Sequence, residues 1–152
     1  MSRNFYIGLL AAAIGVGAVF FYRTESQLEQ IAEFGGVSLR IEYATTASAR
    51  EKGLSGRDSI PSDYGMLFVF QRDDKYGFWM RDTLVPLDIF WLDNKGQVVH
   101  IEQNVATSTY PNVFYPTEPA RYVLETVAGF ASEHDIKIGS KLMLKNLESV
   151  SQ

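Results

Sequence analysis

The sequence FWMRDTLVPLDIFWLD, from Phe78 to Asp93, decides the fold prediction, because two apolar runs in it flank a polar segment. The runs Tyr76–Met80 and Leu87–Leu92 are rich in aromatic and β-branched residues, which favour strands. Pro86 cannot donate a backbone hydrogen bond, so strand pairing should stop there. We therefore predict two strands joined by a polar turn.

Short apolar runs of the same kind recur along the chain. Val37, Leu39, Ile41 and Tyr43 alternate with polar residues, as expected of a half-buried strand. The sequence DNKG at 93–96 indicates a hairpin that pairs its flanking strands antiparallel. The predicted strands are 37–43, 66–70, 76–80, 87–92, 97–103, 121–126 and 141–147, with short helices at 45–53 and 128–134. This pattern predicts a mainly β fold, a small curled sheet or barrel of about seven short strands.

The N-terminal segment has a different character. Phe5–Tyr22 carries no charge, and as a helix it would span roughly 27 Å, about the thickness of a bilayer core. We predict a membrane anchor at 1–23, a polar stalk or linker at 24–36 and a β-barrel-like domain at 37–152. Basic residues are slightly in excess before the anchor, which favours a single-pass inner-membrane protein with a periplasmic domain. The alternative is a cleaved signal peptide and a secreted domain.

Charge and cysteine content exclude several functions. Without Arg3 and Arg23, the 14 basic residues become 12 against 18 acidic ones, a net charge of −6 for the rest of the chain. A nucleic-acid partner is therefore not expected, because no basic stripe is available to neutralise phosphates. The chain has no cysteine, which excludes disulfides, thiolate nucleophiles and cysteine zinc sites.

The two histidines do not form a convincing metal site. His100 and Glu102 fall on the same face of a predicted strand, and together they could offer two ligands. Catalytic zinc needs three protein ligands as a rule. We expect a solvated strand face here, and neither a metal nor a cofactor.

The acidic residues leave two interpretations open. Asp82 or Asp88 could work with Glu125 as a general acid–base pair, if burial raised one pKa above the other. Alternatively, Asp82 and Thr83 serve to satisfy the backbone groups of a turn. The neighbouring aromatics Phe90 and Trp91 must point to opposite faces of a strand, so one faces outward unless both faces of the sheet are covered.

Four blocks of the sequence resemble a known family. They are GLSGRDSIPSDYGMLFVF (53–70), FWMRDTLVPLDIFWLD (78–93), GQVVHIEQNV (96–105) and YPTEPARYVLETVAGFASEHDIKIGSKL (115–142). In order and spacing they resemble the prokaryotic family called domain of unknown function 192, over about 37–144. The resemblance implies a compact, barrel-like β domain, often behind a secretory or anchoring N-terminus, and implies no reaction. Many relatives carry cysteines before the YP block, and this chain has none at 106–116.

The family positions and nearby tyrosines define the candidate ligand-binding site, without assigned catalytic or metal-binding residues. Its members are Arg57, Trp79, Met80, Asp82, Thr83, Asp88, Tyr115, Arg121, Tyr122 and Glu125. Our first hypothesis is a non-enzymatic binding or accessory module for a saccharide, an envelope component such as an envelope protein, or a loop of a partner protein. The alternatives are a hydrolase-like enzyme using Asp82 or Asp88 with Glu125, and a purely structural assembly domain.

Overall fold

The computed structural model describes residues 30–144. The predicted membrane anchor at 1–23 and the first part of the predicted linker lie outside the described residues. Within 30–144, no helix is long and apolar enough to cross a membrane.

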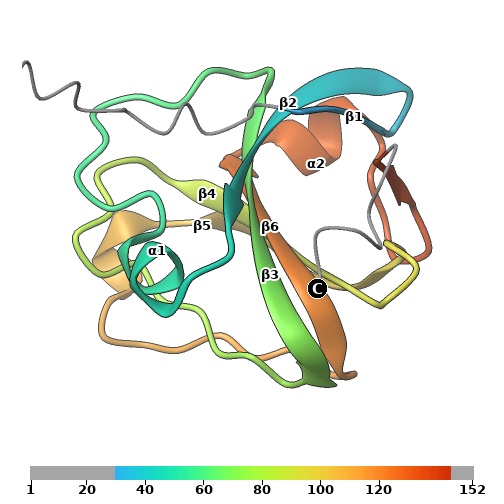
Figure 1. Cartoon of the computed structure of the whole chain (residues 1–152). Coiled ribbons are helices and arrows are strands. Elements are labelled where there is room, and N and C mark those ends of the chain that lie inside the picture. Colours follow the sequence, from blue (N-terminus) through green and yellow to red (C-terminus); the bar gives the residue numbers. More distant parts are fainter. Residues whose placement is uncertain (1–29, 145–152) are drawn as a thin grey trace, which may run out of the picture.

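The described chain forms one seven-stranded sheet with two short α-helices (Figure 1), as the sequence predicts. The sheet order is β5-β4-β6-β3-β2-β1-β7. All pairings are antiparallel except that of β2 and β3, which are connected through α1. The elements are β1 (Gln30–Phe34), β2 (Val37–Ala44), α1 (Ala47–Lys52), β3 (Tyr64–Asp74), β4 (Leu87–Leu92), β5 (Val98–Val105), the 3-10 helix η1 (Thr107–Thr109), β6 (Ala120–Val127), α2 (Phe130–Glu133) and β7 (Leu142–Met143).

The two ends of the sheet meet at one corner. Gln97, just before β5, forms a β-bridge with Lys141, just before β7. The Val98 amide donates to the Ser140 carbonyl at 2.8 Å, and the Leu142 amide donates to the Gly96 carbonyl at 2.9 Å. These bonds confirm the predicted curled sheet.

The curled sheet separates two hydrophobic clusters. The inner cluster contains Phe34, Phe90 and Phe130, whose rings contact one another. The outer cluster contains Trp91 and Phe78 and is covered by α1 and the loops. Both faces of β4 are thus buried, so neither Phe90 nor Trp91 faces outward. Phe90 and Trp91 are therefore both core residues, one on each face of the sheet.

Two assignments made from the sequence were wrong. Tyr76–Met80 is not a strand; it contributes only one bridge, between Phe78 and Phe114. Its apolar side chains serve another purpose, since Phe78 and Met80 insert into the outer cluster, while Trp79 between them is 43% exposed. The missing strand is β1, which lies in the predicted linker. Ala32 and Phe34 are buried, whereas Ile31 is 57% exposed and Glu33 is exposed on the other side of the strand.

The boundaries of other helices and strands agree more closely with those predicted from the sequence. β4 coincides with its predicted range, and β4 and β5 pair antiparallel around the 93–96 turn, as predicted. α1 begins after Thr46, whose hydroxyl accepts from the Ala49 amide at 3.1 Å, and ends at Gly53. The last strand is shorter than predicted, and positions 145–147 of that prediction lie outside the described residues.

Candidate functional site

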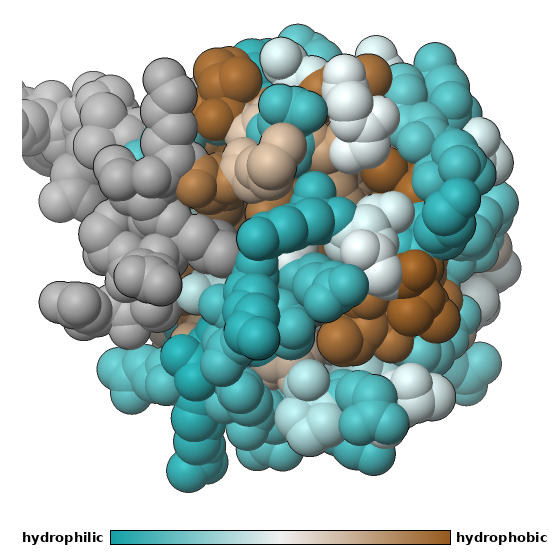
Figure 2. Space-filling model, turned by 90° about the vertical axis from the view of Figure 1, so that its right-hand side faces the viewer, coloured by the Kyte–Doolittle hydropathy of each residue, from teal (hydrophilic) through white to brown (hydrophobic). Residues whose placement is uncertain are grey.

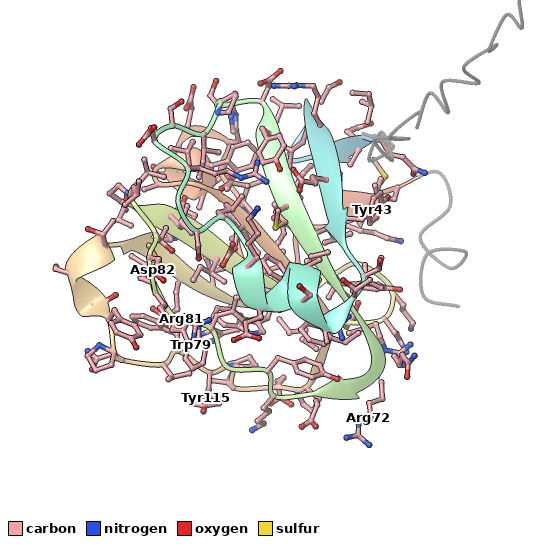
Figure 3. The ribbon with its side chains drawn as sticks, turned by 60° about the vertical axis from the view of Figure 1, so that its left-hand side comes forward. Tyr43, Arg72, Trp79, Arg81, Asp82 and Tyr115 are labelled. Carbon is pink, nitrogen blue, oxygen red and sulfur yellow. The ribbon has the colours of Figure 1, made fainter. Side chains whose placement is uncertain are left out.

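A cavity of about 270 Å³ opens beside α1 on the outer face of the sheet. Strands β3 and β6 form its floor, α1 forms one wall, and the segment from Tyr76 to Thr83 forms the other. The lining residues are Arg50, Glu51, Lys52, Gly53, Leu54, Ser55, Phe68, Phe70, Tyr76, Gly77, Phe78, Trp79, Thr83 and Glu125. Figure 3 shows this side of the molecule, with α1 in front and Trp79 and Arg81 close to it. Figure 2 shows the side turned away, where the described surface is mostly hydrophilic and hydrophobic residues form separate patches.

Glu125 lies at the floor of the cavity. It belongs to a row of paired residues that runs from Glu42 through Met66 to Glu125 across three strands. Its side chain is buried, and its Oε2 atom has no hydrogen-bond partner. Burial raises the pKa of Glu125 to about 8, and Arg57 opposes part of this rise. The acid is therefore mostly neutral at pH 7 and free to form a hydrogen bond with a ligand.

A glycine at the end of α1 keeps the floor open. Gly53 has a φ of +49°, in the left-handed region that favours glycine. A Cβ atom at this position would lie 3.2 Å from Cζ of Phe68 and 3.7 Å from Oε2 of Glu125. Any larger residue would strain the turn and occupy space in front of the acid.

Aromatic rings form much of the cavity wall. Phe68 and Phe78 meet edge to face at 4.8 Å, and Phe70 stacks on Tyr76 with ring centroids 3.5 Å apart. The Arg50 guanidinium lies 5.1 Å from the Phe70 ring centroid. Its Nη1 atom donates to the carbonyls of Thr45 at 2.6 Å and Val69 at 3.0 Å, which fix it at the cavity wall. The cavity is thus apolar and aromatic around a single buried acid.

The rim is exposed and charged. Glu51, Lys52 and Trp79 are all exposed there. Arg81 lies 5.1 Å from the Trp79 ring centroid, and its Nη2 atom bonds Glu51 Oε1 at 3.0 Å. These contacts link α1 to the opposite wall across the surface (Figure 3).

Arg57 is engaged in a network beside the cavity. Its Nη2 atom donates to Glu42 Oε2 at 2.9 Å and its Nη1 atom to the Tyr64 hydroxyl at 2.8 Å, and the Tyr64 hydroxyl also bonds Glu42. Burial acts to raise the pKa of Glu42, but the hydrogen bonds from Tyr64 and Arg57 hold it below its usual value. Arg57 therefore has a structural partner and acts on Glu125 only through its field.

Asp88 lies on the opposite face of the sheet from Glu125. Its carboxylate is fully buried and accepts from the amides of Asn104 at 2.7 Å and Ala131 at 2.8 Å. These bonds tie β5 and the start of α2 to β4. The predicted acid–base pair of Asp88 and Glu125 is therefore wrong, because the sheet separates the two groups.

The remaining candidate residues divide between core and surface. Of the ten, only Trp79, Thr83 and Glu125 line the cavity. Met80 belongs to the outer cluster, and Tyr122 belongs to the inner one.

The other three lie at the surface, outside the cavity lining. Asp82 is exposed, in a turn with a φ of +54°. With Arg81 it lines an adjoining depression, which shares Glu51, Lys52 and Ser55 with the cavity. Tyr115 is 59% exposed, and Arg121 pairs with Asp73 at 2.6 Å. Asp82 therefore does not line the cavity whose floor holds Glu125.

Sequence reasoning missed the contribution of α1. Arg50 and Lys52 gave no motif signal, and their position depends on how the connection between β2 and β3 packs against the sheet. One available signal was the terminal glycine of the predicted helix, which suggested a turn but not its closeness to Glu125.

No metal site is evident in the described part of the chain. Within residues 30–144, no group of three or more His, Cys, Asp or Glu side chains could hold a metal ion. His100 Nε2 and Glu102 Oε1 do lie on one strand face, 3.2 Å apart.

Fold and site together define a small curled β-sheet domain with a buried acid in an aromatic cavity. The chain belongs to the family called domain of unknown function 192 (uncharacterized ACR), whose model matches residues 30–144. This match confirms the resemblance seen in the sequence and includes β1.

Two crystal structures are similar to the chain. One is a proposed transcription regulator from Sinorhizobium meliloti 1021, 29% identical over 78% of this chain and 95% of that one, with a TM-score of 0.73. The other is a protein of unknown function from Novosphingobium aromaticivorans DSM 12444, 31% identical over 74% of this chain and 81% of that one, with a TM-score of 0.67. No curated protein matches the chain.

Proposed function

We propose that this domain binds a small molecule in the cavity beside α1, with Glu125 as the group that recognises it. The observation that carries the proposal is the unpartnered, buried Oε2 atom of Glu125 at the cavity floor. A buried polar atom without a partner costs roughly 1–3 kcal/mol, a cost that a bound ligand could remove. Concave, mostly apolar sites with few polar groups are typical of small-ligand binding.

Acid–base catalysis by Glu125 is the second candidate. A pKa of about 8 is suitable for proton transfer near neutral pH. The polar neighbours favour binding instead, because the hydroxyls of Ser55 and Thr83 both donate to the Arg81 carbonyl. The Tyr76 hydroxyl donates to the Arg72 carbonyl, and no histidine lines the cavity to activate a nucleophile.

The test is a thermal-shift screen of the full-length protein in a non-ionic detergent. Saccharides, small amines, amino acids and small carboxylates serve as probes, because a ligand that prefers the folded state raises the melting temperature. We expect at least one class to stabilise the wild type and to lose this effect in Glu125→Gln. The control is Glu133→Gln, which changes an exposed acid on α2. Stabilisation that persists in Glu125→Gln would contradict the assignment of Glu125.

We also propose that residues 5–22 anchor the protein in the inner membrane, with the domain on the periplasmic side. The uncharged segment between Arg3 and Arg23 supports this proposal. A reporter enzyme that is active only outside the cytoplasm, fused after Gln152, should be active. An inactive fusion at normal expression would show that the orientation is reversed.

Regulation of transcription by direct DNA binding is not part of the proposal, because the chain beyond the anchor carries an excess of acidic residues.

A further inference from the structure

The floor and the rim of the cavity favour opposite charges in a ligand. The floor presents Glu125 Oε2, a buried acceptor with no donor beside it. Toward the opening, α1 contributes two cations, Arg50 on the cavity wall and Lys52 on the exposed rim. The third charged residue of α1, Glu51, is already paired with Arg81. A ligand that reaches from rim to floor therefore passes from a cationic to an acidic environment.

We propose that the cavity binds a small zwitterion of the amino-acid type, with its ammonium group against Glu125 and its acidic group toward Arg50 and Lys52. This inference rests on the proposed function, because it assigns a ligand class to the same cavity.

An ammonium group fits the floor better than a hydroxyl group does. It offers three N–H donors, and its charge offsets that of the ionised Glu125. Phe68 and Phe78 line the cavity with aromatic rings, and aromatic faces attract cations. A saccharide would bring several hydroxyls toward a floor whose other side chains are apolar, such as Phe68, and burying hydroxyls without partners is costly.

The rim favours a zwitterion over a simple cation. Arg50 and Lys52 repel a ligand that carries only positive charge, whereas an acidic group on the same ligand turns this repulsion into attraction. The bonds from Arg50 to the carbonyls of Thr45 and Val69 use two of its five N–H groups. They orient the guanidinium and leave it donors for an anion.

Binding of an ammonium group should release a proton. Glu125 is mostly protonated at about pH 7, because burial raises its pKa to about 8, and an adjacent cation would ionise it. Five charged or titratable groups from neighbouring elements act on this carboxyl or line its cavity with it: Arg57 near β3, Arg50, Glu51 and Lys52 on α1, and Tyr76 on the opposite wall. The pKa of Tyr76 lies above its usual value because of burial, and that of Arg57 is also raised, so neither should titrate near pH 7.

The experiment is isothermal titration calorimetry on the full-length protein in a non-ionic detergent. The standard amino acids are tested first, and the tightest binder is then compared with its decarboxylated amine and its deaminated acid. For leucine these analogues are isoamylamine and isocaproate. Measurement in buffers with different ionisation enthalpies gives the number of protons released. Glucose and isoamyl alcohol serve as neutral probes, and Glu133→Gln is the matched control for Glu125→Gln.

We expect an amino acid to bind with release of about one proton at about pH 7. The amine should bind about tenfold more weakly and the deaminated acid about a hundredfold more weakly, with a similarly large loss in Glu125→Gln and none in Glu133→Gln. A deaminated acid or neutral probe that binds as tightly as the amino acid would overturn the zwitterion inference and leave the proposed function standing. If no probe of any class binds, both fall.

Discussion

Two buried carboxylates on neighbouring strands, Asp88 and Glu125, have opposite environments. Ile89, next to Asp88, pairs directly with Glu125, so the two acids lie close in the sheet but on opposite faces. Asp88 has an amide donor on each oxygen and joins three elements of the inner side. Glu125 has an unpartnered oxygen in an open cavity. A buried acid whose hydrogen bonds are all made within the protein stabilises the fold. A buried acid that faces a cavity and lacks such hydrogen bonds is a candidate for binding a ligand.

The largest expected effect is that of Asp88→Asn. The side-chain nitrogen of asparagine would face one of the two backbone N–H groups, which would then have no acceptor. The other N–H group would donate to a neutral amide oxygen instead of a carboxylate. We expect the free energy of unfolding to fall by about 3–5 kcal/mol. Glu125→Gln should not lower it at pH 7, because the folded wild type holds a proton there that the unfolded chain has released, and glutamine avoids that cost. Chemical denaturation of both variants tests the comparison, and equal losses would contradict it.

The next largest effect is a loss of folding stability at alkaline pH, caused by the ionisation of Glu125. Its pKa is raised from 4.5 to about 8 on folding, so the unfolded chain releases this proton at lower pH than the folded one. The contribution of Glu125 to folding stability is fully present below about pH 4.5 and falls as the pH rises. By about pH 8 and above, on the order of 5 kcal/mol is lost. Glu125→Gln should lack this contribution, and Glu133→Gln should keep it. The same slope in all three proteins would show that Glu125 is not its source.

A smaller effect is expected from Arg57→Gln. Arg57 and Glu42 are each partly exposed, so solvent screens their pair and its loss should cost about 1 kcal/mol. The change also removes the positive field that lowers the pKa of Glu125, so the alkaline transition should move to higher pH. Denaturation curves at several pH values measure both effects. A transition that moves to lower pH would show that Arg57 does not act on Glu125 in this way.

The smallest effect is expected from Arg121→Gln. Its pair with Asp73 is at the surface, where ion pairs contribute less than about 1 kcal/mol. Arg121 does not line the cavity, so ligand binding should not change. Calorimetry with the best ligand of the wild type checks this, and a large loss of affinity would extend the site beyond the cavity described here.

The sequence predicted the fold where local pattern and environment agree. The run Leu87–Leu92, apolar except for Asp88, is a strand buried on both faces, as parallel and central strands often are. The aromatic run Tyr76–Met80 gave a false strand, because a loop that crosses a hydrophobic face also carries large apolar side chains, here the buried Phe78 and Met80. β1 was missed because only Ala32 and Phe34 of its five residues are buried.

The site was less predictable because it depends on strand register and on a crossover connection. Glu125 and Asp88 were both candidates, but which face each one occupies depends on the pairing of β4 with β6, which the sequence alone does not specify. Arg50 and Lys52 reach the cavity only because α1 packs over β3 on the way from β2. Trp79, Thr83 and Glu125 were found because they lie in the family blocks.

The most direct test is a titration of the Glu125 carboxyl group by carbon-13 NMR, assigned by comparison with Glu125→Gln. The carboxyl resonance of the wild-type protein should titrate with a midpoint of about pH 8, far above the ordinary value of 4.5. That result would establish a buried acid that lacks a partner at the floor of the cavity. A midpoint near 4.5 would contradict the account, because it would mean that Glu125 is hydrated or paired in the folded protein.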